Sequence, residues 1–128
     1  MRLVRAVAAS FAILSLAAGL AGAQSYPSKP VRVVIPWPPG GGNDIAGRIV
    51  MQKLSEALGQ QFTIDNRGGA GGTIGTEFVA KAPADGYTIM VQSTTHVGNA
   101  HLYKKLVYDP LRDFAPVARL TARPAQNP

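Results

Sequence analysis

VRVVIPWPPGGGND, residues 31–44, joins a short apolar run to a turn of proline and glycine and then to a helical pattern. The run is apolar except for Arg32, as expected for a strand that is covered on both faces. Pro38 and Pro39 keep the chain extended, and three glycines allow backbone φ values that other residues rarely adopt. The stretch therefore predicts a strand, a tight turn and the start of a helix.

The glycine turn, Gly40-Gly41-Gly42, predicts an anion site. Such a turn exposes backbone N–H groups at the positive end of a helix dipole, where a small anion is held without lysine or arginine. Three adjacent glycines cost backbone entropy that an ordinary turn does not require, which favours close approach to a ligand. Trp37, the only tryptophan, is expected to form a partly buried wall beside the turn because its N–H needs a partner.

The residues after this turn predict a helix over residues 44–58. Asn43 is a favoured N-cap residue, and Gly59 is a favoured residue just after a helix end. Asp44 either complements the helix dipole or bonds to a ligand amine or hydroxyl, and the pattern leaves both open. The apolar face expected of this helix comprises Ala46, Ile49, Val50, Leu54 and Ala57.

Two further strand-to-loop transitions follow. Residues 62–66 predict a strand that enters a second glycine-rich turn, 67–72, and then a helix capped by Thr73. The buried stripe expected of that helix is Ile74, Phe78 and Ala82. Residues 87–92 predict a third strand, whose exit loop, 93–99, is polar.

Alternating strands and helices predict an α/β fold with right-handed crossovers and a parallel sheet. In open parallel sheets, ligands bind beyond the carboxyl ends of the strands, where all three loops are expected. Weaker patterns predict a short helix over residues 100–105, a turn at 108–110 and a fourth strand over 116–121.

The amino terminus predicts export. Arg2 and Arg5 precede an apolar run, 6–20, and a small-residue site, 21–23, so residues 1–23 are expected to be a cleaved signal peptide that directs the chain to the periplasm. Its loss would lower the net charge from +6 to +4, since two arginines leave. The expected lobe spans residues 24–121, followed by a disordered tail, 122–128. Scattered basic residues do not indicate a nucleic-acid partner.

An exported enzyme domain that binds a phosphate-bearing cofactor is the alternative function. AGGTIG, residues 70–75, differs by one residue from the GxGxxG dinucleotide fingerprint and lies between a strand and a helix. The first glycine is replaced by alanine, however, and an exported protein meets little NAD. The chain has no cysteine, no GxSxG motif, and only two histidines, His96 and His101, so we expect no catalytic residues, cofactor or metal.

Several longer motifs resemble one family. YPSKPVRVVIPWPPGGGNDIAGRIVMQKLSEALGQ, GAGGTIGTEFVAKAPADGYTIM and STTHVGNAHLYKKLVYDPLRDFAPVA are similar to the tripartite tricarboxylate transporter substrate-binding proteins, or Bug receptors. The resemblance implies a non-enzymatic periplasmic receptor with a type II periplasmic-binding-protein-like fold. Such receptors close two α/β lobes around small organic acids, such as di- or tricarboxylates, and deliver them to a membrane transporter.

The resemblance also implies which residues bind the ligand. In the family, backbone groups and water at the first turn hold the carboxylate, and the second turn and third loop complete one wall. The corresponding residues are Trp37, Pro38, Gly40, Gly41, Gly42, Asn43, Asp44, Gly71, Gly72, Thr73, Thr94, Thr95, His96 and Asn99. Gly68 stands where the family usually has proline. The chain resembles an amino-terminal, truncated receptor with the second lobe missing.

We predict that export removes residues 1–23. The basic head, apolar run and small-residue site stand in the order that signal peptidase requires. Amino-terminal sequencing of periplasmic material should begin at Gln24. Recovery of a membrane-bound protein that retains Met1 would contradict this prediction.

Overall fold

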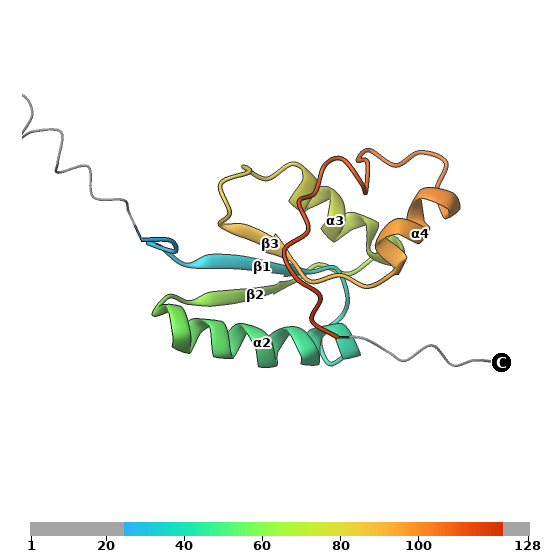
Figure 1. Cartoon of the computed structure of the whole chain (residues 1–128). Helices are drawn as coiled ribbons and strands as arrows, with labels where there is room; N and C mark the ends of the chain where they lie inside the picture. Colours follow the sequence, from blue (N-terminus) through green and yellow to red (C-terminus); the bar gives the residue numbers. More distant parts are fainter. Residues whose placement is uncertain (1–24, 122–128) are drawn as a thin grey trace, which may run out of the picture.

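A computed structural model describes residues 25–121, and its centre is a three-stranded parallel sheet (Figure 1). The strands are β1 (Val31–Ile35), β2 (Phe62–Asn66) and β3 (Thr88–Met90), in the order β2-β1-β3. Val33 of β1 lies opposite Ile64 of β2 and Ile89 of β3. The predicted parallel α/β sheet is therefore confirmed. The proposed signal peptide and tail lie outside the described residues.

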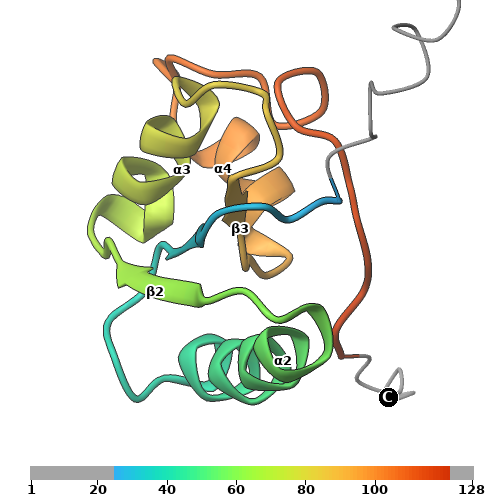
Figure 2. The same ribbon diagram turned by 90° about the vertical axis from the view of Figure 1, so that its left-hand side faces the viewer.

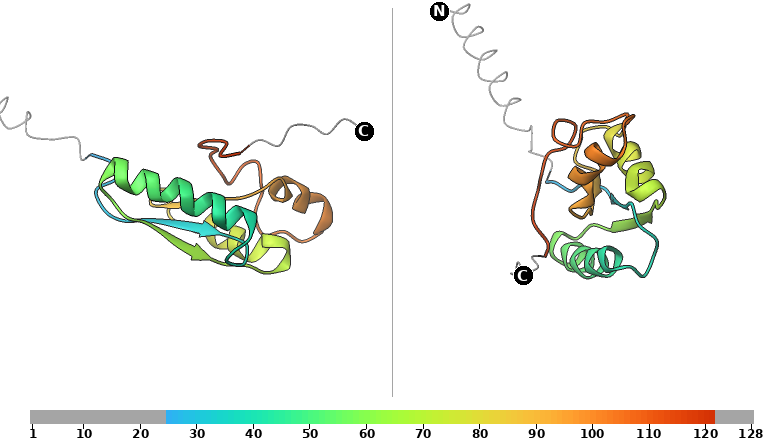
Figure 3. Two further views of the ribbon diagram at one scale, coloured as in Figure 1. Left: turned by 90° about the horizontal axis from the view of Figure 1, so that it is seen from below. Right: turned by 90° about the vertical axis from the view of Figure 1, so that its right-hand side faces the viewer.

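Helices cover both faces of the sheet. Helix α2 (Gly42–Leu58) lies on one face, and α3 (Thr73–Ala80) and α4 (Thr95–Leu102) lie on the other (Figure 2). A 3₁₀ turn, η2 (Ala70–Gly72), leads directly into α3. The chain after α4 then passes from the α3 side of the molecule toward α2 (Figure 3). No helix among residues 25–121 is both long and apolar enough to cross a membrane.

The central strand forms most of the core. Val31, Val33, Val34 and Ile35 are fully buried, and Arg32 is exposed. Each buried aliphatic side chain contributes about 1.5–3 kcal/mol relative to an exposed one. Because β1 has a strand on either side and helices on both faces, a nearly continuous apolar sequence is required, as the run of residues 31–36 predicted.

Helix α2 differs from the prediction at its start and on its buried face. Gly41, not Asn43, is the N-cap residue, and no side chain caps the helix. Gly59 does follow the helix with φ +66°, as predicted. Ile49 is 62% exposed, because the helix instead turns Gly47 to the sheet. A Cβ on Gly47 would lie 2.9 Å from Ile35 Cδ1, so the missing side chain allows this close packing.

The second helix also packs through small residues. Gly75 and Thr76 are buried, whereas Ile74, predicted to be buried, is 55% exposed. Thr73 does not cap α3; its hydroxyl donates to the carbonyl of Ala70. A Cβ on Gly75 would lie 2.6 Å from the Arg67 carbonyl oxygen, so α3 rests on the loop that precedes it.

The carboxyl-terminal predictions were partly wrong. The short helix lies at Thr95–Leu102 rather than 100–105. The turn near residues 108–110 is confirmed, because the Asp109 carboxylate accepts bonds from the backbone of Leu111 and Arg112. Residues 116–121 form no strand: they pair with none of the described strands, and Val117 is 90% exposed. Apolar residues alone do not make a strand without a ladder of hydrogen bonds.

We predict opposite effects for alanine at two helical glycines. Gly75→Ala should destabilise the fold by about 1–3 kcal/mol, because the added methyl meets backbone atoms that cannot move aside. Gly98→Ala, in α4, meets nothing within 4 Å and should be neutral or stabilising by up to about 1 kcal/mol. Urea unfolding of both variants measures the difference. Equal stabilities would contradict the close packing of α3.

Candidate functional site

The carboxyl ends of the three strands define one edge of the sheet, and a helix begins just beyond each of them. The N-cap residues of α2, α3 and α4 are Gly41, Gly72 and Thr94. None of the three helices has a side-chain cap among the described residues. Uncapped helix starts leave backbone N–H donors at the positive end of the helix dipole. At α3 and α4 some of these donors are already used, because the Thr73 N–H bonds to the Ala70 carbonyl and the His96 N–H to the Ser93 carbonyl. This edge is therefore suited to an anion.

The first turn follows β1. Gly40 has φ +83°, in the left-handed region that favours glycine, and the helix starts with the bond from Ile45 N–H to the Gly41 carbonyl at 2.9 Å. The N–H groups of Gly42 and Asn43 have no acceptor among the described residues. These groups are donors that the turn can offer to a ligand.

A buried carboxylate supports this turn. The Asp44 side chain is only 3% exposed, and its Oδ2 accepts bonds from Arg48 Nε at 2.9 Å and from the Gly40 N–H at 2.8 Å. Its Oδ1 accepts a bond from Asn66 Nδ2 at 3.0 Å. The bonds from Arg48, Gly40 and Asn66, in that order, hold the pKa of Asp44 well below its usual range. The carboxylate is thus occupied by protein donors.

Asn66 connects the same turn to the end of β2. The Asn66 side-chain NH₂ also donates to the Trp37 backbone carbonyl at 3.1 Å. The Asn66 side-chain oxygen, Oδ1, accepts a bond from Arg48 Nη2 at 3.0 Å. Both ends of the Asn66 amide are therefore used. The first turn is held at its start through Trp37 and at its helix end through Asp44.

Trp37 is half-buried and packs against the core cluster. Its indole N–H donates to Gln92 Oε1 at 2.8 Å, so the partner comes from the exit of β3 rather than from the adjacent loop. Pro38, the next residue, is exposed. Trp37 therefore lies between the core and the edge at which the helices begin.

The second turn contains four successive residues with positive φ, beginning with Gly69 at φ +126°. Gly71 and Gly72 have φ +63° and +88°, and Ala70 has φ +46°, which is uncommon for a residue with a side chain. The buried Asn99 of α4 donates its amide to the Gly71 carbonyl at 3.0 Å. Asn99 therefore fixes the second turn, and its amide faces backbone rather than solvent.

The third loop places its predicted residues differently. Thr94 and Thr95 are exposed, and the Thr95 hydroxyl lies 2.8 Å from that of Ser93. His96 Nε2 lies 2.9 Å from the Pro110 carbonyl oxygen, and its ring meets the Phe114 ring edge-on at 4.8 Å between centroids. These contacts direct His96 at the segment after α4 and away from the two glycine turns.

Sequence reasoning missed four polar residues that organise this edge: Arg48, Asn66, Thr76 and Gln92. Asn66 ends β2 and Gln92 follows β3, so a search for polar residues at strand ends would have found two of them. Thr76 lies about one helical turn into α3 and Arg48 nearly two turns into α2, where the sequence gives no comparable signal.

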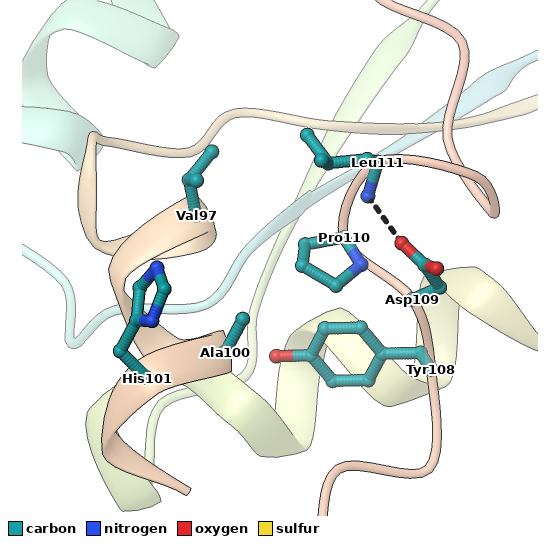
Figure 4. Close-up of a pocket in the computed structure, with 7 residues that line it drawn as sticks. All are labelled: Val97, Ala100, His101, Tyr108, Asp109, Pro110 and Leu111. Carbon is teal, nitrogen blue, oxygen red and sulfur yellow. Dashed lines mark hydrogen bonds between the residues drawn. The ribbon is translucent and has the colours of Figure 1, made fainter.

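A separate shallow hollow lies between α4 and the turn that follows it (Figure 4). Its volume is about 370 Å³, and its lining residues are Val97, Ala100, His101, Tyr108, Asp109, Pro110 and Leu111. The lining is mostly apolar, and the Asp109 carboxylate is already used by its own turn. It offers no array of free donors comparable to that of the glycine turns.

We predict that Asp44 makes stability depend on pH in acid. A carboxylate whose folded pKa is lowered stabilises the fold above its unfolded pKa of about 4, and this contribution is lost as the pH falls through the folded value. Urea unfolding between pH 6 and pH 2 should show that the stability of the parent falls progressively below about pH 5. The Asp44→Asn variant should be less stable than the parent at pH 6, and its free energy of unfolding should fall less as the pH is lowered. Glu56→Gln, on the exposed face of α2, is the control and should keep the parent's slope.

The family model of the tripartite tricarboxylate transporter family receptor matches residues 46–126. A UPF0065 protein from a Pseudomonas species is 46% identical over 79% of this chain and 30% of its own length. The chain spans about a third of the length of the curated relatives it matches.

Solved structures show the same lobe. MatC from Rhodopseudomonas palustris, with bound malate, matches 74% of this chain and 33% of its own, with a TM-score of 0.70 and 41% identity. The periplasmic binding protein BugD matches 71% of this chain and 30% of its own, with a TM-score of 0.68 and 40% identity. This chain belongs to the tripartite tricarboxylate transporter receptor family, whose members are solute receptors.

Proposed function

We propose that this chain forms one wall of a periplasmic site for a small organic di- or tricarboxylate. The observation that carries the proposal is the row of three helix starts without side-chain caps at one edge of the sheet. Malate in the similar MatC structure supports the carboxylate class. A receptor built with this wall delivers its ligand to the membrane subunits of a tripartite tricarboxylate transporter.

The charges near the first turn favour backbone donors over a cationic side chain. Arg48 is the basic residue of the first helical turns, and its guanidinium is already paired with Asp44 and bonded to Asn66. The free N–H groups of Gly42 and Asn43 then remain for the ligand. A hydrogen bond to a charged group contributes about 1.5–3 kcal/mol, so two or three such donors suffice for a weak-to-moderate site.

The proposed roles divide the predicted site residues into two groups. The direct contacts are the Trp37 ring and backbone groups of Pro38, Gly41, Gly42 and Asn43, with Thr94 and Thr95 at the rim. The supporting residues are Gly40, Asp44, Gly71, Gly72, Thr73, His96 and Asn99, whose polar groups bond to protein atoms.

The alternative, a cofactor-binding enzyme domain, receives less support. Ala70 stands where the dinucleotide fingerprint has its first glycine. The turn that follows is hydrogen-bonded to α4, because Asn99 donates to the Gly71 carbonyl. A pyrophosphate needs open backbone at that turn. The family to which the chain belongs is also one of receptors rather than enzymes.

Calorimetry separates the two functions. The protein should be a completed receptor in which residues 25–121 are joined to the remaining part of MatC, because this chain matches only a third of that protein. Malate or citrate should release or absorb heat on binding, and NAD should not. Heat with NAD and none with any carboxylate would replace the receptor proposal by the cofactor proposal.

Within this completed receptor, we predict that Gly42→Pro weakens malate binding by about 1–3 kcal/mol. Proline is well tolerated at the first position of a helix, and Gly41 before it is already extended, with φ −75° and ψ 165°. The substitution thus removes one N–H donor with little backbone strain. Malate titration measures the loss of affinity.

Gly42→Ala is the matched control. Alanine keeps the N–H, and its Cβ would meet nothing within 4 Å. Its affinity should equal that of the parent. If the proline variant binds as tightly as the alanine variant while both remain folded, the first turn does not hold the carboxylate.

A further inference from the structure

Gln92 lies just beyond β3, where the chain turns toward α4, and it is half-buried. Its side-chain amide bonds to the exit of β1, to helix α3, which follows the β2 exit, and to its own loop. The hydrogen bonds that it makes join Trp37, Ser93 and Thr76. No other described side chain connects all three loops of the candidate site in this way.

The chemistry of the partners fixes the orientation of the amide. An indole N–H can only donate, so Gln92 Oε1 must face Trp37 Nε1, at 2.8 Å. The same oxygen accepts the Ser93 backbone N–H at 2.9 Å. The NH₂ group is therefore turned toward Thr76 Oγ1, at 3.2 Å.

Thr76 continues the connection to the second turn. It is fully buried, and because its hydroxyl oxygen accepts from Gln92, its proton is free to donate to the Gly72 carbonyl at 2.7 Å. One chain of bonds thus runs from Trp37 through Gln92 and Thr76 to Gly72. It starts at the β1 exit and ends at the turn after β2.

The second turn also packs directly against this chain of bonds. A Cβ on Gly72 would lie 3.3 Å from Gln92 Nε2, 3.3 Å from the Pro36 carbonyl oxygen and 3.5 Å from Trp37 Cζ2. A side chain at this position would press on both the amide and the indole. The absence of a side chain allows the backbone of the second turn to approach them.

We propose that Gln92 is the positioning residue of this wall: it fixes the indole of Trp37 and holds the second turn and third loop against it. The inference rests on the proposed carboxylate site, of which Trp37 is one side. Removal of the amide would leave a half-buried indole N–H and a buried hydroxyl without their partners. The ring would then be free to move, and a preorganised wall would become a mobile one.

The unique tryptophan makes this inference measurable in the full chain. Trp37 is the only fluorophore of its kind, so its emission reports on this position alone. Gln92→Leu should shift the emission maximum to longer wavelength and raise the acrylamide quenching constant about twofold, as a half-buried ring becomes accessible. Gln92→Glu keeps oxygen acceptors for Trp37 and Ser93 and should retain the parent's emission.

Two controls exclude a general loss of structure. Gln52→Leu replaces an exposed glutamine of α2 outside the network and should leave emission unchanged. Gly59→Ala lowers stability through strain at φ +66°, with open space around its Cβ, and should also leave the emission of the folded state unchanged. An unchanged Trp37 signal in Gln92→Leu, or equal signals in Gln92→Leu and Gln92→Glu, would overturn the inference.

Binding separates this inference from the proposed function. In the receptor completed with MatC, Gln92→Leu should raise the Kd for malate about tenfold, as for the loss of one hydrogen-bonded support. If the parent and the Gln92→Leu variant bind malate with equal affinity, the inference is overturned and the proposed function stays intact. A parent that binds no carboxylate overturns the proposed function, and with it the role of Gln92 in binding, while the emission still decides whether Gln92 anchors Trp37.

Discussion

The buried Asp44 carboxylate is the contact on which the geometry of the first turn depends. It stands in the first turn of α2, where a negative charge is favoured by the helix dipole, and it uses that position to hold Gly40 from one side and Asn66 from the other. A buried charge is tolerated only when it is paired and hydrogen-bonded, and Arg48 satisfies that requirement. The turn is therefore fixed through the Gly40 N–H, and the N–H groups of Gly42 and Asn43 stay open.

The two polar networks at this edge are complementary. The Asp44 network joins the exits of β1 and β2, whereas the network of Gln92 joins the exits of β1 and β3 and reaches the second turn through Thr76. Trp37 belongs to both, because its carbonyl accepts from Asn66 and its indole donates to Gln92. Movement of Trp37 would therefore disturb all three loops of the wall.

Much of the fold followed from local rules. The apolar run before the first turn predicted the buried β1, and Gly59 predicted the end of α2, because burial on both faces and positive φ each restrict the sequence strongly. Asn43 and Ile49 were predicted wrongly because capping and helical periodicity are weak preferences. Close packing of Gly47 on Ile35 overrides them by rotating a different face toward the sheet.

The site was less predictable for a different reason. The glycine turns are visible in sequence, but the side chains that hold them bond across 22, 29 and 55 residues, for Asn66 with Asp44, Asn66 with Trp37, and Trp37 with Gln92. Such pairs depend on strand order, and β1 lies between β2 and β3 only once the sheet has formed. A sequence pattern gives the strand ends but not which of their polar residues face one another.

The pairing of Arg48 with Asp44 also determines what kind of anion site this edge can be. With its nearby charges balanced, the wall offers oriented but neutral backbone donors instead of a bidentate guanidinium. The affinity of these backbone donors for an anion depends on how accurately each N–H is oriented, because no net positive charge compensates for a misplaced donor. Supports that do not touch the ligand, such as Asp44 and Gln92, then matter for affinity as much as the donors themselves. This is the physical reason to expect that changes behind the wall, and not only on its surface, alter binding.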